Sequence, residues 1–156
     1  MNLASISENL DIEKRVAITP EIAKKYISLG FNLNLPQNYA SHLGFEDDEY
    51  ESAGVNLLKN NKEIINNSEV FIQLDLPDEE KLSFFRENQT LIGSLNSFLN
   101  KEKLEKLKSK KINCFSLELL PRITRAQSMD ILSSQANLAG YKAVVEAFQV
   151  YERAIP

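Results

Sequence analysis

The run Val70-Phe71-Ile72-Gln73-Leu74 decides the fold class, because it is almost continuously apolar and is bounded by polar residues. Such a run is typical of a strand in a parallel sheet that is covered on both faces. Outward from it, short apolar runs alternate along the chain with segments of helical periodicity. This alternation predicts an α/β fold with a mostly parallel sheet.

The same signals place the other elements. Thr19 is expected to be the N-cap of a helix whose first residue is Pro20, and Gly30 suits the left-handed C-cap of that helix. The expected strands cover residues 3–6, 31–35, 55–58, 70–74, 90–93 and 112–117. Further helices are expected over residues 46–53, 59–67, 101–111 and 128–153, with one more opening at residue 77.

Composition excludes several classes of protein. The 156 residues are enough for about one domain, and 43% hydrophobic with 26% charged residues excludes a disordered or collagen-like chain. A net charge of -4 argues against nucleic acid or an anionic membrane surface as the main partner. The first residues do not form a signal peptide, and no apolar run is long enough to insert into a membrane. The default expectation is a soluble intracellular domain.

Single reactive residues carry little chemistry here. The single cysteine, Cys114, cannot form an internal disulfide. One cysteine and one histidine, His42, are too few ligands for a zinc or iron–sulfur site, so no metal site is expected. Cys114 lies in an expected buried strand and is interpreted as a small core residue. His42 is interpreted as a surface loop residue. The lysine-rich residues 101–111 keep helical spacing at Leu104 and Leu107, which favours a solvated helix face over a nucleic-acid patch.

The densest polar stretch, residues 121–134, directly follows the last expected strand. Ligands of open α/β sheets bind just past the carboxyl ends of strands. Gln127, Asp130 and Ser133 follow one another in steps of three and share a helix face, and Arg122 adds a fork of donors. From spacing alone, an ordinary capped helix start with an Arg–Asp pair explains this stretch as well as a binding site does.

Several motifs together carry a family resemblance. Residues 13–20, EKRVAITP, resemble the R-V-A-x-T-P signature of the alanine dehydrogenase and pyridine nucleotide transhydrogenase family. Residues 121–141, PRITRAQSMDILSSQANLAGY, closely resemble the R-I-S-R-A-Q-x-M-D-x-L-S-S-x-x-N-x-A-G-Y block of its proton-translocating branch. Residues 44–55 resemble the F-x-D-x-x-Y-x-x-A-G-A segment between them. The resemblance covers the whole chain in order.

The resemblance implies a flavodoxin- or Rossmann-like, doubly wound fold with a long C-terminal helix. It implies an α/β domain at residues 1–134, a linking helix at residues 135–156, and hydride transfer between NAD(H) and NADP(H) coupled to proton translocation. The family's nicotinamide-facing loop maps onto four positions of this sequence. There, Arg122 and Ser133 would hold the nicotinamide carboxamide. Gln127 would reach toward NADP(H) on a partner domain, and Asp130 would orient Arg122 and Gln127.

The resemblance also implies partners. None of the five glycines forms a G-x-G-x-x-G turn, so the NAD fingerprint would belong to a second domain beyond Pro156. The NADP(H)-binding and membrane domains would lie further on or in partner chains, which places this chain in the cytoplasm, peripheral to the inner membrane. We expect a homodimer. A small-residue stripe on the last helix would join the domains: Ala136, Ala139, Gly140, Ala143 and Ala147.

Two alternatives stay open. Alanine dehydrogenases of the family carry a substrate-binding lysine where this chain has Gln73, and a catalytic histidine where it has Asn96, so an amino-acid dehydrogenase is disfavoured. Transhydrogenases commonly keep that lysine too, so Gln73 departs from both. The other alternative is a non-catalytic module that binds a partner through its last helix.

Overall fold

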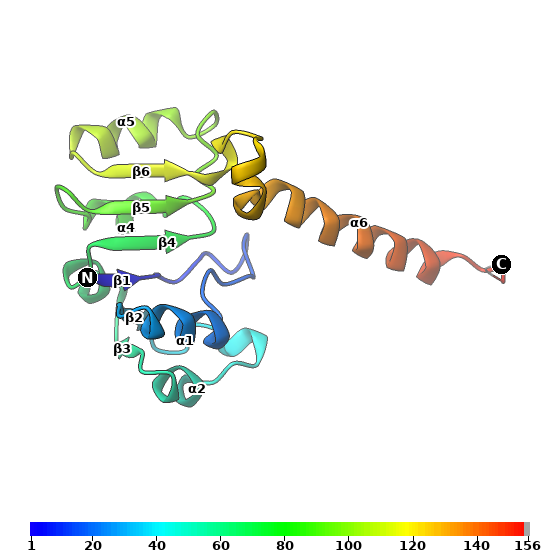
Figure 1. Cartoon of the computed structure of the whole chain (residues 1–156), viewed down its shortest axis with the longest axis horizontal. Coiled ribbons are helices and arrows are strands. Elements are labelled where there is room, and N and C mark those ends of the chain that lie inside the picture. The colour runs from blue at the N-terminus through cyan, green and yellow to red at the C-terminus, as the bar shows by residue number, and fades with distance from the viewer. Residues whose placement is uncertain (155–156) are drawn as a thin grey trace. The chain divides into compact units, whose positions relative to one another are not determined.

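The structure is a computed structural model that describes residues 1–154 and divides into two compact units, Met1–Ser116 and Leu117–Pro156. The first unit contains a six-stranded sheet in the order β3-β2-β1-β4-β5-β6, with every neighbouring pair parallel (Figure 1). The strands are β1 (Asn2–Ala4), β2 (Asn32–Pro36), β3 (Asn56–Leu58), β4 (Val70–Gln73), β5 (Thr90–Gly93) and β6 (Asn113–Ser116). The predicted Rossmann-like, doubly wound parallel sheet is confirmed.

Helices connect the strands, and side-chain caps fix where most of them begin. The helices of this unit are α1 (Pro20–Ser28), α2 (Asp47–Ser52), α3 (Asn61–Asn66), α4 (Glu79–Ser83) and α5 (Lys101–Ser109), with a 3-10 turn η1 (Ser41–Leu43). As the sequence predicts, the Thr19 hydroxyl accepts from the Ile22 amide and Pro20 is the first helical residue of α1. Such caps satisfy amides that have no partner inside the helix.

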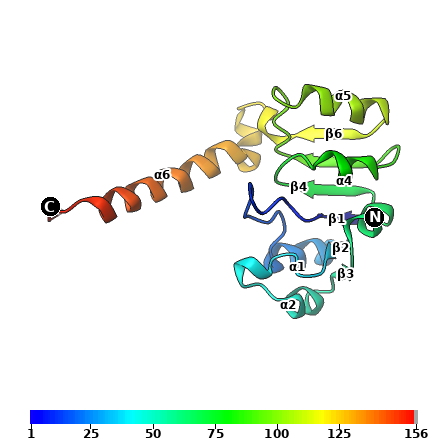
Figure 2. The same ribbon diagram turned by 180° about the vertical axis from the view of Figure 1, so that it is seen from behind.

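Two apolar clusters lie on opposite faces of the sheet. One contains Phe71 of β4 with apolar residues of α3, α4 and α5, and its Phe71 and Phe85 rings are 4.7 Å apart. The other contains residues of α1 and α2, with Tyr39 and Tyr50 packed edge to face at 6.0 Å. Figures 1 and 2 show α1 and α4 on opposite faces of the sheet. Helices α3, α4 and α5 therefore lie on one face of the sheet, and α1 and α2 lie on the other.

Cys114 departs from the sequence prediction. The interpretation as a buried core residue is wrong, because the Cys114 side chain is exposed. The physical reason is the position of β6, which is the last strand of the sheet and pairs only with β5. The lysine-rich segment behaves as expected: α5 turns Leu107 into the core while Lys106 and Lys108 stay exposed in ion pairs with glutamates.

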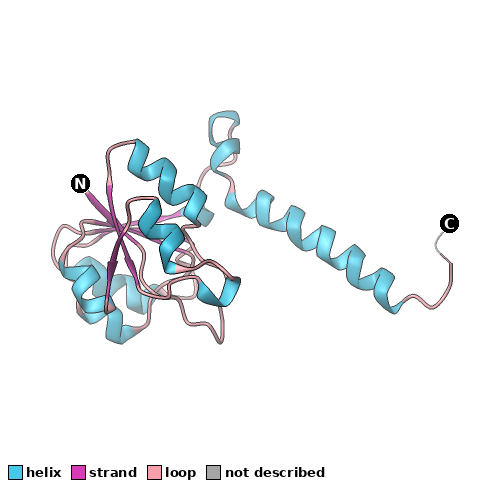
Figure 3. Cartoon of the chain, turned by 90° about the horizontal axis from the view of Figure 1, so that it is seen from below, coloured by secondary structure: helices cyan, strands magenta, loops and turns pink. Residues whose placement is uncertain are grey.

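The second unit consists of short 3-10 turns and one long helix. The turns are η2 (Leu117–Leu119) and η3 (Thr124–Met129), and the helix is α6 (Ile131–Val150), uninterrupted in Figure 3. The expected helix over residues 128–153 therefore begins later than predicted, because η3 covers its first two residues. None of the helices in the described residues is long and apolar enough to cross a membrane. The expected division of the chain into an α/β domain at residues 1–134 and a linking helix at residues 135–156 stays a prediction.

Two glycines give a matched test of local packing. A Cβ atom at Gly93 of β5 would lie 2.4 Å from the Gln73 carbonyl oxygen of the neighbouring strand, whereas one at Gly140 of α6 would meet nothing within 4 Å. We expect Gly93→Ala to lower the free energy of unfolding by about 1–3 kcal/mol, since backbone must shift to admit the methyl group.

Gly140→Ala is the matched control, and it should raise helix stability by about 1 kcal/mol through helix propensity. Urea unfolding followed by circular dichroism measures both variants. Equal effects of the two substitutions would show that the close approach of β4 and β5 does not constrain the fold.

Candidate functional site

A crevice lies at the point where the strand order of the sheet reverses. From β1 the chain adds β2 and then β3 on one side of the sheet. It then crosses to the other side of β1 and adds β4, β5 and β6 there. The loops after β1 and β4 therefore diverge, which is where open α/β sheets bind ligands. A cavity of about 140 Å³ lies there, lined by both loops, including Glu8, Glu13, Gln73 and Asp75.

The buried amide of Gln73 joins the two loops. Its Oε1 atom accepts from the Ser5 hydroxyl at 2.9 Å and from the Ile6 amide at 2.7 Å. Its Nε2 atom donates to the Ile6 carbonyl at 3.2 Å and to Glu8 Oε1 at 3.1 Å. Ser5 in turn accepts from the Tyr39 hydroxyl at 2.8 Å. The hydrogen-bonding capacity of Gln73 is therefore used within the fold.

Glu8 anchors the loop after β1 to the end of β4. Its Oε1 atom accepts from the Leu74 amide at 2.8 Å as well as from Gln73. Burial raises the pKa of this carboxyl, and the nearby charges of Asp75 and Glu13 raise it further, while the hydrogen bond from Leu74 opposes them. A carboxylate in this position adds negative charge to the crevice without being free to turn toward a ligand.

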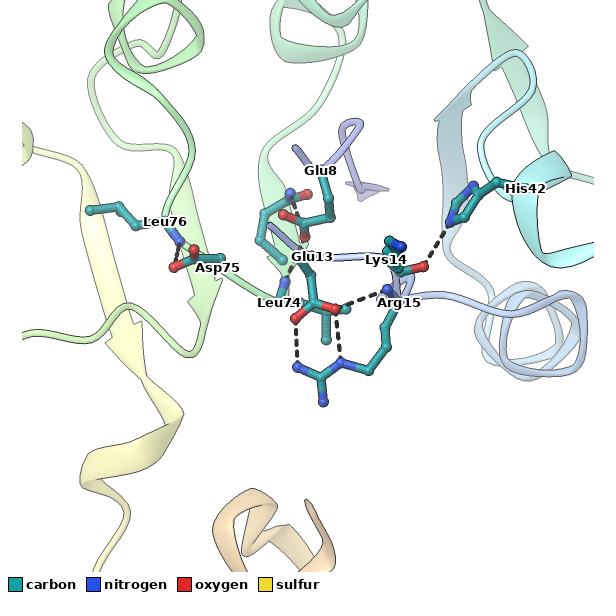
Figure 4. Close-up of polar contacts among 9 residues, drawn as sticks. Glu8, Glu13, Lys14, Arg15, His42, Leu74, Asp75 and Leu76 are labelled. Carbon is teal, nitrogen blue, oxygen red and sulfur yellow. Dashed lines mark hydrogen bonds and ion pairs between the residues drawn. The ribbon is translucent and has the colours of Figure 1, made fainter. Parts of the chain in front are cut away.

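The family-like segment Glu13-Lys14-Arg15 lies beside the crevice (Figure 4). The Arg15 guanidinium donates to both Glu13 oxygens, and this hydrogen bonding lowers the pKa of Glu13. His42 Nε2 lies 2.7 Å from the Lys14 carbonyl oxygen and holds the loop from the other side. His42 is exposed, as expected, and its contact is structural. The arginine is engaged by a carboxylate of its own loop.

A second hollow lies entirely within the Leu117–Pro156 unit. Its volume is about 410 Å³, within the range of about 300–1,000 Å³ that is usual for small-molecule pockets. All four predicted site residues line it: Arg122, Gln127, Asp130 and Ser133. The turn η3 carries Gln127 and the first turn of α6 carries Ser133, so the polar stretch folds back on itself. The structure brings together the residues that spacing alone grouped.

Asp130 is the N-cap of α6 and fixes Ser133. Its Oδ1 atom accepts from the Ser133 amide at 3.0 Å, and its Oδ2 atom accepts from the Ser133 hydroxyl at 2.7 Å. These bonds lower the pKa of Asp130, and the charge of Arg122 contributes to the same shift. Within residues 1–154, no hydrogen bond links the Asp130 side chain to Arg122 or Gln127. Asp130 thus positions Ser133 directly and Arg122 only through its charge.

Sequence reasoning missed Glu8 and Asp75. Both follow strands, but they are 67 residues apart and come together only because β1 and β4 are neighbours. A strand order is not visible in local periodicity. The signal that was available was Gln73 itself, a polar residue at the end of an otherwise apolar run.

Comparisons with known proteins agree on one relationship. The sequence model described as "Alanine dehydrogenase/PNT, N-terminal domain" matches residues 6–139. The chain is 34% identical over its whole length to the first part of NAD(P) transhydrogenase subunit alpha of Rickettsia prowazekii, of which it covers 42%. It is 26% identical over 93% of its length to alanine dehydrogenase 1 of Staphylococcus aureus, of which it covers 38%.

A solved structure supports the same relationship. The crystal structure of transhydrogenase from Sinorhizobium meliloti superimposes with a TM-score of 0.89 at 35% identity. The superposition covers 98% of this chain and 46% of that one. The chain therefore spans less than half the length of the relatives it matches.

The buried carboxyl of Glu8 makes the stability of the crevice depend on pH. Its pKa is raised above the usual 4.5, so the folded state keeps this proton to higher pH than the unfolded state. The free energy of unfolding contributed by Glu8 therefore falls as the pH rises from 4.5 through the raised pKa. Glu8→Gln keeps an oxygen for the Leu74 amide and should remove this fall.

Glu13→Gln is the control with the opposite sign. Because the pKa of Glu13 is lowered, its stabilisation is present above 4.5 and disappears as the pH falls through the lowered pKa. This variant should lose stability at neutral pH and match wild type in acid. Urea midpoints from about pH 2 to about pH 8 measure both. An unchanged pH profile for Glu8→Gln would mean that Glu8 is not held in a buried, charge-crowded position.

Proposed function

Because this chain belongs to the alanine dehydrogenase/PNT family, we propose that it is the N-terminal part of an NAD(P) transhydrogenase alpha subunit. The proposed reaction is hydride transfer between NAD(H) and NADP(H), coupled in the whole enzyme to proton translocation. The chain's higher identity to transhydrogenase subunits than to an alanine dehydrogenase supports this choice within the family.

The observation that carries the proposal is the hollow lined by Arg122, Gln127, Asp130 and Ser133. A nicotinamide carries a carboxamide, whose oxygen accepts and whose nitrogen donates hydrogen bonds. The Arg122 guanidinium can donate to the oxygen. The Ser133 hydroxyl, whose proton is donated to Asp130, can accept from the nitrogen through its oxygen, as can the Gln127 amide oxygen. The residues present therefore fit the nicotinamide end of the cofactor. When bound, NAD(H) supplies or accepts the hydride.

Each residue has a proposed role in placing that ring. Arg122 donates to the carboxamide oxygen, and Ser133 orients the carboxamide from the other side. Asp130 positions Ser133 through the two bonds described above. Gln127 extends toward the nucleotide held by a partner domain. No general acid or base is needed, so the contribution of these residues is proximity and orientation, which can supply up to roughly 7–11 kcal/mol.

The rest of the machinery is proposed to lie outside this chain. A second domain with a glycine-rich loop would hold the NAD pyrophosphate at a helix N-terminus. Other domains would bind NADP(H) and cross the membrane, and the present chain would sit on the cytoplasmic side, peripheral to the inner membrane. Most of the affinity for NADH would then reside in the second domain.

The crevice between β1 and β4 disfavours the amino-acid dehydrogenase alternative. The cavity there has a volume of about 140 Å³, and four carboxylates line it, Glu8, Glu13, Asp75 and Asp78, with Lys81 and Lys103 as the only cations of the described lining. Gln73 stands where that branch carries a lysine, and its amide is bonded within the fold. The non-catalytic alternative is distinguished by what is encoded after residue 156, since a strand followed by G-x-G-x-x-G supports the enzyme.

Arg122→Ala tests the proposed function in the full-length enzyme. We expect it to slow hydride transfer on the order of 100-fold while NADH affinity changes much less, because misplacing reacting atoms by about 1 Å has that effect. Stopped-flow transfer between NADH and an NADP+ analogue, beside equilibrium NADH titration, separates the two quantities.

Arg125→Ala is the matched control. Arg125 is an exposed arginine three residues away that does not line the hollow. This variant should transfer hydride at the wild-type rate. Wild-type transfer by Arg122→Ala, with only weaker NADH binding, would contradict the role given to this loop.

The apolar surface of α6 leads to a prediction about assembly. Its side chains include Tyr141, 74% exposed, and Phe148, 52% exposed, beside the alanine and glycine stripe. Exposed apolar patches mark association sites, so we propose that α6 mediates homodimer formation. Sedimentation of the 156-residue chain should show dimers at high concentration. Phe148→Glu should shift them to monomer, whereas Lys142→Glu should shift them less. A wild-type chain that stays monomeric across the millimolar range would contradict this.

A further inference from the structure

A hollow of about 290 Å³ lies between α4 and α5, which pack on the same face of the sheet (Figure 2). Leu82 of α4 and Leu107 of α5 line it, and both are buried members of the core cluster on that face, so they form its apolar floor. Two contacts join the helices across it. Lys106 Nζ donates to Glu79 Oε1 at 2.7 Å, and Lys110 Nζ donates to the Leu82 carbonyl at 3.1 Å. These contacts set the spacing of the two helices.

The rim of the hollow is positively charged. Three lysines and one carboxylate line it: Lys103, Lys106, Lys110 and Glu79. Lys103 differs from the other two lysines, because it is half-buried and makes no hydrogen bond or ion pair within residues 1–154. The carboxylates at the start of α4 are paired with other lysines, Asp78 with Lys81 and Glu79 with Lys106. Lys103 is therefore a cation beside an apolar floor with no ion-pair partner in the described chain.

Charge and floor together define the class of ligand. Lysines are rarely withdrawn from water unless their charge is paired, and an anion placed at Lys103 supplies that partner. The floor formed by Leu82 and Leu107 favours an apolar body, because apolar surface gains free energy when it leaves water. A ligand that satisfies both conditions is an amphiphile with an anionic head.

The dimensions favour a small molecule over a docked helix. The helix α4 has only five residues, which span about 7.5 Å at about 1.5 Å per residue, so this side of the hollow is little longer than one helical turn. The volume of about 290 Å³ equals that of about ten water molecules at about 30 Å³ each. A linear carboxylate of about eight carbons has about ten non-hydrogen atoms and so matches this volume.

We propose that the hollow between α4 and α5 binds a free medium-chain carboxylate, with its chain on Leu82 and Leu107 and its head at Lys103. This inference goes beyond the proposed function and does not depend on it. Every residue that carries it belongs to the Met1–Ser116 unit, and none of them has a proposed role in hydride transfer.

NMR titration of the isotope-labelled 156-residue chain with octanoate tests the site. We expect saturable shift changes at the amides of α4 and α5, with a Kd on the order of 1 mM. Lys103→Gln should weaken octanoate binding about threefold to fivefold, as the loss of a partly exposed ion pair does. Octanamide has the same chain without the charge, so it should bind wild type and Lys103→Gln equally.

Lys101→Gln is the matched control, because Lys101 is an exposed lysine of α5 that does not line the hollow. This variant should bind octanoate like wild type. Equal weakening by Lys101→Gln and Lys103→Gln would show that only the overall charge of α5 matters, and would overturn the proposal. Shift changes that gather on the exposed helix α6, or no saturable change at all, would also overturn it.

Vesicles of anionic phospholipid distinguish a free carboxylate from a lipid surface. We expect the chain not to sediment with such vesicles. Sedimentation with vesicles in the absence of octanoate binding would assign the lysines of α5 to a membrane surface and overturn the proposal. Far-UV circular dichroism of each variant checks its fold.

Discussion

The side-chain amide of Gln73 binds the chain leaving β1 to the end of β4, and the crevice has its form because of that link. β1 pairs with β4 over only two residue pairs, Leu3 with Val70 and Ala4 with Phe71. Beyond these two pairs, the side-chain amide of Gln73 continues the connection. It accepts from the backbone N–H of Ile6 and donates to the backbone carbonyl of Ile6. A buried amide left without these partners would cost about 1–3 kcal/mol for each unsatisfied group. This explains why the end of an apolar strand carries a polar residue.

The two units differ in whether their polar side chains are already bonded within the protein. In the Met1–Ser116 unit, the crevice is rich in carboxylates whose partners lie within the protein, such as Glu8 with the Leu74 amide and Glu13 with Arg15. In the Leu117–Pro156 unit, Arg122 and Gln127 line an open hollow, and Asp130 is satisfied by Ser133. The first arrangement holds a loop in place, and the second leaves donors and acceptors available to a ligand. Position at a strand end is therefore not enough to identify a binding site.

Local signals in the sequence predicted most of the fold. The cap at Thr19 and the proline after it set the start of α1, and steps of three residues grouped Gln127, Asp130 and Ser133. These signals act within one turn of a helix, so they can be recognised without knowing the rest of the structure. The exposure of Cys114 and the contact of Glu8 with the end of β4 both depend on the order of the strands in the sheet. That order brings together residues that are far apart in the sequence, such as Ile6 and Gln73, which are 67 residues apart and hydrogen-bonded. Neither could be obtained from periodicity.

The central place of β1 also shapes how the chain assembles as it is made. β2 and β3 follow β1 directly, so this half of the sheet can pair as soon as Leu58 has emerged from the ribosome. The partner on the other side, β4, begins at Val70, 12 residues after Leu58, a delay of roughly 0.6–2.4 s at usual rates of synthesis. During that interval the edge of β1 that later pairs with β4 has no strand partner, and an unpaired strand edge is a template for pairing with another chain.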